Sequence, residues 1–235
     1  MKNGLGIFVT VLLAALLILT ACSKNNPVTG DTVADQCLSL EGSAKDNCYL
    51  NAGQCSKIEN PQARDSCVAE LAKKKNDLAV CDLVVDGKTK AFCQEQIAVQ
   101  KNDPEMCKNI KDSYWQDNCY YHVAINLKDF DKCAYVSEVS QNLDCVKKVA
   151  IASNNAELCG RLSATNKAEC IVKIATQTMD ATVCAQFKDN TGTGSVNASA
   201  CYLKIAKLSG KKEICDSINI KQIKQSCVDY FAAKK

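Results

Sequence analysis

Cysteine is the residue type whose number and spacing point most directly to chemistry in this chain. Of the 17 cysteines, 16 fall into eight pairs, and most pairs recur after about 26 residues. Regularly spaced cysteines in even number are typical of a disulfide framework in an oxidising compartment. The predicted bridges are Cys37–Cys48, Cys55–Cys67, Cys81–Cys93, Cys107–Cys119, Cys133–Cys145, Cys159–Cys170, Cys184–Cys201 and Cys215–Cys227.

Metal binding is the other chemistry that clustered cysteines support. Thiolate metal sites use close pairs such as Cys-x-x-Cys, whereas the closest pair here, Cys48 and Cys55, has six intervening residues. We therefore expect disulfide bonds, no metal site and no cofactor.

Acid, base or nucleophilic catalysis would have to use His122, the single histidine of the chain. A triad needs a histidine beside a nucleophile, and no Gly-x-Ser-x-Gly sequence occurs. His122 stands three residues after Cys119, a position that we expect to face solvent. Other pairs carry charged or amide side chains at this position: Glu70, Gln96, Lys148, Lys173 and Lys204.

Carboxylates also recur, at Asp46, Asp65 and Asp117, near the start of the second predicted helix of a repeat. Negative charge suits that end of a helix dipole, so we expect a structural role rather than acid/base work. The sequence thus predicts a protein that is not an enzyme.

The unpaired cysteine, Cys22, ends an apolar N-terminal segment. Lys2, the apolar run from Ile7 to Leu19 and the small residue before Cys22 match the zones of a secretory signal peptide. The run is short for a membrane span, which needs about 20 residues. An ordinary cleaved leader, or an uncleaved anchor with Cys22 incidental, is the alternative.

The four residues Leu19-Thr20-Ala21-Cys22 resemble the lipobox of bacterial-type lipoproteins. The resemblance implies that residues 1–21 are a lipoprotein signal peptide and that the Cys22 thiol carries palmitate-like acyl chains. It also implies a membrane anchor outside the cytoplasm, at the cell envelope. Residues 22–35 then form the lipidated cysteine and a flexible tether that reaches about 20 Å.

The charge pattern argues against nucleic-acid binding. The formal net charge is only +3, with lysines and acidic residues interspersed along the chain, so there is no basic footprint. A low aromatic content of 6%, with few prolines and glycines, favours helix over sheet.

Each repeat begins with a predicted short helix of about two turns. Four residues before the first cysteine, six repeats carry a residue that is favoured at helix N-caps: Asn51, Asp77, Asp103, Asp129, Asn155 and Asp180. Pro104 follows Asp103, at the first helical position. Three residues after the first cysteine stands an apolar side chain, on the same helix face: Leu40, Ile58, Val84, Ile110, Val136, Leu162, Phe187 and Ile218.

The second helix of each repeat is predicted to run for three to four turns. Seven repeats show the pattern Cys-x-x-x-apolar-Ala, in which the apolar residue shares the cysteine's face and the alanine lets another helix approach. The pattern ends in Leu71-Ala72, Ile97-Ala98, Val123-Ala124, Val149-Ala150, Ile174-Ala175, Ile205-Ala206 and Phe231-Ala232. Gly53 cuts the helix that holds Cys48, as expected of a terminal cap.

These marks predict an all-α solenoid of about eight disulfide-stapled αα-hairpins over residues 36–235. Turn formers such as Gly42, Pro61 and Gly87 lie midway between the paired cysteines, which favours bridges within each hairpin. Each bridge closes a small loop worth roughly 3 kcal/mol. The architecture loosely resembles the cysteine-rich Sel1-like repeat proteins, although repeat length and cysteine spacing differ, and no residue or activity follows from that resemblance.

One repeat departs from the pattern with aromatic side chains. Trp115, the single tryptophan, stands where other repeats carry small or polar residues, with Tyr114, Tyr121 and His122 nearby. Such residues are enriched at binding hot spots, although Trp115 alternatively covers the adjacent repeat. Tyr120 occupies an apolar position and is expected in the core.

A second irregularity is the longer, Gly- and Thr-rich segment between Cys184 and Cys201. It is either a functional loop or a tolerated insertion, and it ends near the glycosylation-type triplet Asn197-Ala198-Ser199.

Taken together, these features predict a lipid-anchored, extracytoplasmic repeat protein that binds an unknown protein or peptide without catalysis. The alternative is a cell-envelope protein that binds glycan or a small ligand through the aromatic patch of the fourth repeat.

Overall fold

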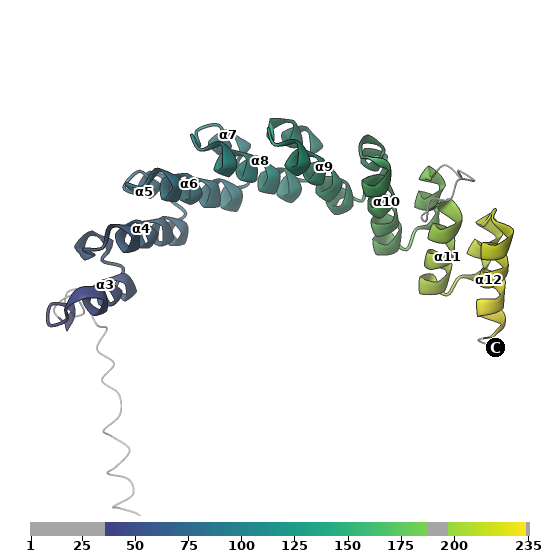
Figure 1. The fold of residues 1–235 in the computed structure, drawn as a ribbon, viewed down its shortest axis with the longest axis horizontal. Helices are drawn as coiled ribbons and strands as arrows, with labels where there is room; N and C mark the ends of the chain where they lie inside the picture. Colours follow the sequence, from purple (N-terminus) through teal and green to yellow (C-terminus); the bar gives the residue numbers. More distant parts are fainter. Residues whose placement is uncertain (1–35, 188–196, 234–235) are drawn as a thin grey trace, which may run out of the picture. The chain divides into compact units, whose positions relative to one another are not determined.

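The computed structural model describes residues 36–187 and 197–233, and every regular element in these ranges is a helix (Figure 1). The predicted signal peptide, Cys22 and the tether lie outside the described residues. The chain divides into two compact units, Met1–Cys67 and Val68–Lys235, and the boundary falls inside helix α4 (Pro61–Lys75). Each unit is built from the predicted disulfide-stapled helical hairpins, which pack in the order of the sequence as a solenoid.

All eight predicted bridges are present, from Cys37–Cys48 at one end to Cys215–Cys227 at the other. The Cα atoms of the joined cysteines are 5.4–5.8 Å apart. Every half-cystine except Cys48 is buried. The pairing within each hairpin is therefore confirmed, and the sulfur atoms form part of the core.

The second helices share one register. Five of them have 15 residues and begin six positions before their second cysteine: α4, α6 (Gly87–Lys101), α8 (Ser113–Leu127), α9 (Val139–Ser153) and α10 (Ala164–Thr178). The others are shorter: α3 (Gly42–Asn51), α11 (Ala198–Ser209) and α12 (Lys221–Ala232). The truncation of α3 is as predicted, because Gly53 follows it with φ +68°.

The residues expected in the turns instead begin the second helices. Gly42, Pro61 and Gly87 each occupy the first helical position, where a proline loses no hydrogen bond. The same register places Val139 at the start of α9. The connection between the two helices thus lies just before these residues.

The first helices are shorter or tighter than expected. Among the first helices that the structure describes in full, two are single α-turns, α5 (Leu78–Cys81) and α7 (Pro104–Cys107), and five are 3-10 segments: η1 (Cys55–Lys57), η2 (Phe130–Tyr135), η3 (Ala156–Arg161), η4 (Ala181–Gln186) and η5 (Lys212–Ser217). Such short pieces are typical of 3-10 geometry. In every repeat the amide three residues after the first cysteine donates to that cysteine's carbonyl, as from Ile110 to Cys107 at 3.2 Å.

Five of the six predicted N-caps are confirmed. A side-chain oxygen of Asp77, Asp103, Asp129, Asn155 or Asp180 accepts a hydrogen bond from the amide two residues later. The prediction for Asn51 is wrong, because this residue is the last of α3. In that repeat the first helix starts at the cysteine itself, and Gln54 takes the cap position.

The apolar-Ala pairs of the second helices form the core. Ile97, Val123, Val149, Ile174 and Ile205, with the alanine that follows each, are 0% exposed. Phe231 is half-buried and Ala232 exposed, because no described helix follows α12. The apolar residue after the first helix is buried in most repeats as well, whereas Leu40 is an exception.

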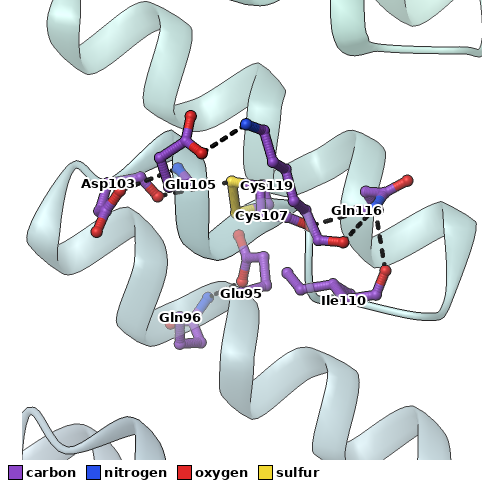
Figure 2. Close-up of a disulfide and its surroundings, with 9 residues drawn as sticks. Glu95, Gln96, Asp103, Glu105, Cys107, Ile110, Gln116 and Cys119 are labelled. Carbon is purple, nitrogen blue, oxygen red and sulfur yellow. Dashed lines mark hydrogen bonds and ion pairs between the residues drawn. A yellow bond between two sulfur atoms is a disulfide. The ribbon is translucent and has the colours of Figure 1, made fainter.

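A polar side chain three residues before the second cysteine closes the connection inside a hairpin. The Gln116 amide nitrogen donates to the carbonyls of Cys107 and Ile110 at 3.2 and 3.1 Å, beside the Cys107–Cys119 bridge (Figure 2). Asn142 makes the equivalent bonds to Cys133 and Val136. The carbonyls of Cys107 and Cys133 thus accept a side-chain hydrogen bond in addition to the one from the amide three residues later, and these extra bonds fix the connection between the two helices.

Reduction of the disulfides tests how far they hold the fold. A first helix of one or two turns is unstable alone, and each bridge removes roughly 3 kcal/mol of chain entropy. We expect dithiothreitol to abolish the helical circular dichroism at a temperature at which the oxidised protein is intact.

A matched pair of variants locates the effect. Cys133→Ser with Cys145→Ser opens a central hairpin, whereas Cys37→Ser with Cys48→Ser opens a terminal one, so the first pair should lower the melting temperature more. Helical signal that persists after complete reduction would contradict the prediction.

Candidate functional site

The recurring carboxylates bind backbone, as a structural role requires. The Asp117 carboxylate accepts hydrogen bonds from the amides of Ser137 and Glu138 at 2.9 and 3.0 Å, in the connection of the next repeat. Asp46 accepts in the same way from Glu59 and Asn60. The predicted structural role is confirmed for these two, although their partners are the neighbouring repeat's amides rather than their own helix dipole.

His122 lies on the exposed side of α8, as predicted, and its ring meets Tyr121 edge to face at 5.1 Å. At the equivalent position Lys148, Lys173 and Lys204 are also exposed, whereas Gln96 is half-buried. Within the described ranges no group of three histidine, cysteine or acidic residues could hold a metal ion.

Trp115 belongs to an aromatic cluster that spans two repeats. Its ring lies 4.9 Å from Phe92 on α6 and 5.0 Å from Tyr114, measured between ring centroids. Trp115 itself is half-buried and packs against the core, whereas Tyr114 is 64% exposed. Trp115 thus covers the preceding repeat and supports Tyr114 at the surface.

Tyr121 forms a separate contact to the following repeat. Its hydroxyl donates to the Asp144 carboxylate on α9 at 2.7 Å. Burial of the phenol, and then this hydrogen bond, raise the pKa of Tyr121 far above its usual value. Because Tyr121 lies six positions after Trp115, the two side chains point about 120° apart around α8. The four candidate residues therefore form two groups, Tyr114 with Trp115 and Tyr121 with His122.

Tyr120 is buried, as expected of its apolar position. Its ring stacks on Tyr135 with 5.0 Å between centroids and 24° between planes. Burial raises the pKa of Tyr120 as well.

An exposed apolar set lies at or beside the connections between first and second helices in the third to fifth repeats. Its members are between 53% and 77% exposed. We call them the turn-edge residues: Leu83, Val85, Tyr114, Tyr135 and Val139. Of these five residues, the sequence pattern indicated only Tyr114 as a binding residue, although apolar side chains at positions that usually hold polar turn residues were a visible signal.

The irregular segment between Cys184 and Cys201 lies largely outside the described residues, at positions 188–196. The adjoining Asn197 caps α11, accepting from the Ala200 amide at 2.9 Å. Ser199 is buried, and its hydroxyl oxygen accepts from the Ile220 amide at 3.3 Å. Both polar side chains of the Asn197-Ala198-Ser199 triplet thus take part in the fold.

Among the described helices, none is both long and apolar enough to cross a membrane.

Comparison of the chain with protein-family models, with curated proteins and with solved structures gives no match. The resemblances to the lipobox and to Sel1-like repeats stay predictions.

The two neighbouring aromatic residues should differ in their effect on stability. Trp115→Ala removes a half-buried ring from the Phe92 contact, and we expect a loss of about 2 kcal/mol in the free energy of unfolding. Tyr114→Ala removes an exposed ring and should cost less than about 0.5 kcal/mol. Urea denaturation with the disulfides intact measures both, and a small effect for Trp115→Ala would mark it as a contact residue instead.

Proposed function

We propose that this protein is a lipid-anchored, extracytoplasmic scaffold that binds a protein or peptide and carries out no catalysis. The observation that supports this best is the set of turn-edge residues, five apolar side chains exposed on three consecutive cross-linked repeats. Repeat arrays are well suited to binding extended partners, because neighbouring repeats offer equivalent positions at regular intervals.

The rigidity of the hairpins favours such a role. Binding costs conformational entropy when the surface must become ordered, and here each hairpin is already closed by its own disulfide. Tyr114 is further supported by Trp115, whose ring centroid lies 5.0 Å from that of Tyr114 and 4.9 Å from that of Phe92. An exposed tyrosine on a fixed base is a typical interface anchor.

The compartment follows in part from the fold. Eight disulfides indicate an oxidising, extracytoplasmic environment. The lipid anchor rests on the lipobox-like Leu19-Thr20-Ala21-Cys22, where acyl chains on Cys22 would hold the protein at a membrane of the cell envelope.

The surroundings of the reactive side chains among the described residues support a function without catalysis. His122 is exposed, and its nearest ring partner is a tyrosine. The buried carboxylates Asp46 and Asp117 already accept hydrogen bonds from backbone amides.

A second candidate function is glycan binding, favoured by one observation. Tyr114 stands edge to face with Trp115 at the surface, and exposed aromatic rings can stack on the apolar face of a sugar. We therefore include this outcome in the test.

Site-specific cross-linking tests the scaffold function. A photoreactive residue in place of Tyr114 or Val139 should form an adduct with one and the same envelope protein in intact cells, identified by mass spectrometry. Leu127, exposed at the opposite end of the same helix as Tyr114, is the matched control and should give no such adduct.

The alternative outcomes are distinct. Retention on cell-wall polysaccharide that Tyr114→Ala abolishes would support glycan binding instead. If neither an adduct nor retention is found, both candidate functions fail.

The anchor has its own test. In a bacterial host that processes lipoproteins, the wild-type chain should incorporate a palmitate analogue and sediment with membranes, because the acylated thiol of Cys22 inserts into the bilayer. Cys22→Ser should abolish the label and leave the protein in the soluble fraction or with its leader attached, whereas Thr20→Ser should change neither result. A wild-type chain without label would contradict the lipobox prediction.

A further inference from the structure

A groove of about 870 Å³ lies between α10 and α11. Small apolar side chains make up much of its lining, among them Ala164, Ala168 and Val172 on α10 and Ala200 on α11, together with the hydroxyls of Thr165 and Thr176. Lys173 and Lys204, one from each helix, also line it.

The groove follows from the late start of α11. At two other junctions, a residue of one repeat is covered by a residue of the next repeat. The covered residue stands directly before the second cysteine of its own repeat, and the covering residue stands four positions before the second cysteine of the next repeat. Trp115 covers Phe92 with 4.9 Å between ring centroids, and the Gln141 amide donates to Asn118 at 3.0 Å. The five regular second helices begin six positions before their cysteine, but α11 begins only three before Cys201.

At the α10–α11 junction, no pair of described side chains makes the corresponding covering contact. Asn197 takes the covering position, but its side chain turns to cap α11. The residue that Asn197 would cover is Glu169, just before Cys170, and the Glu169 carboxylate pairs with Lys147 on α9 instead. A regular contact of the array is thus replaced by an apolar hollow.

The charges on the groove favour an anionic ligand. Lys173 and Lys204 are both exposed, and neither forms an ion pair with any residue that the structure describes. The acidic residue of the lining, Glu169, already pairs with Lys147 on α9 at 3.2 Å. The two lysines therefore leave a positive rim around an apolar floor.

The geometry of the two lysines selects among anionic ligands. They stand at the same position on packed helices, whose axes are typically 8–10 Å apart. In an extended peptide, acidic side chains two residues apart point to the same face and lie about 7 Å apart, and the flexible lysine side chains can reach both carboxylates at once. A segment with two carboxylates gives each lysine its own counter-charge, whereas a fatty acid offers one carboxylate for both lysines.

We propose that the groove between α10 and α11 binds an acidic peptide segment of the scaffold's partner. Two carboxylates on the outer face of this extended segment pair with the exposed Lys173 and Lys204, and an apolar side chain on its opposite face packs on Ala168 and Val172. The inference rests on the proposed protein-binding function and names the chemistry of the ligand.

Fluorescence anisotropy of the oxidised protein with a fluorescein-labelled peptide that alternates glutamate and leucine tests this inference. The wild-type protein should bind this peptide and should bind a peptide alternating lysine and leucine more weakly. The double variant Lys173→Glu, Lys204→Glu should weaken binding by at least about tenfold, because attraction becomes repulsion.

Two further variants distinguish the effect of charge at the groove from the effect of groove shape. Lys148→Glu reverses a charge at the same position on α9, outside the groove lining, and should change the affinity by less than about twofold. Ala168→Trp fills the floor without changing charge and should weaken binding as the double variant does. Circular dichroism checks that each variant retains its helices.

Three results would overturn the proposal: unchanged affinity in the Lys173→Glu, Lys204→Glu variant, equal binding of the lysine–leucine peptide, or binding only after residues 188–196 are replaced by a Gly-Ser linker. The last result would mean that these residues occupy the groove themselves. The cross-linking experiment from Tyr114 is independent. A partner adduct without binding of the glutamate–leucine peptide would contradict the groove proposal and leave the scaffold function standing. Peptide binding without an adduct would contradict the scaffold function and leave the groove as a site for acidic peptides.

Discussion

The disulfide within each hairpin is the constraint on which the rest of the structure depends. The first helix has only three to six residues wherever it is a separate described element, too few to be stable in isolation. A bridge with Cα atoms 5.4–5.8 Å apart holds it against the middle of the second helix. This local link allows repeats of about 26 residues, shorter than most two-helix repeats, and it supplies core volume through buried sulfur.

Once the hairpins are closed, neighbouring repeats need only a few specific contacts. Apolar-Ala pairs such as Val123-Ala124 supply the buried interface, and polar contacts fix the spacing. Asp117 binds two amides of the next connection, Tyr121 binds Asp144, and Lys147 binds Glu169. Burial of a carboxylate is costly unless its lone pairs are satisfied, so the contact of the buried Asp117 favours one arrangement of successive repeats over shifted ones.

The sequence predicted the parts of this fold that are governed by strong local rules. Cysteine spacing gave the bridges, N-cap preference identified Asp77 and Asp103, and helical periodicity gave the core pairs. It failed where a feature depends on tertiary contacts: the 3-10 form of most first helices, the role of Gln116 in closing the connection, and the exposure of Val139 at the start of α9. The late start of α11 was equally hidden, because Asn197 is as good a cap as any earlier polar residue.

Departures from a repeat pattern are informative because regular repeats already hold one another through the same recurring contacts. A regular junction, such as Asn118 with Gln141, uses polar side chains to hold the neighbouring repeat. Tyr114 and the α10–α11 groove are different: the first adds exposed apolar surface that no described repeat covers, and the second removes a covering side chain while retaining two lysines. Neither change improves packing, so stability does not account for them. Both lie on hairpins held rigid by disulfides, and this makes recognition of a partner the function that the irregular positions best support.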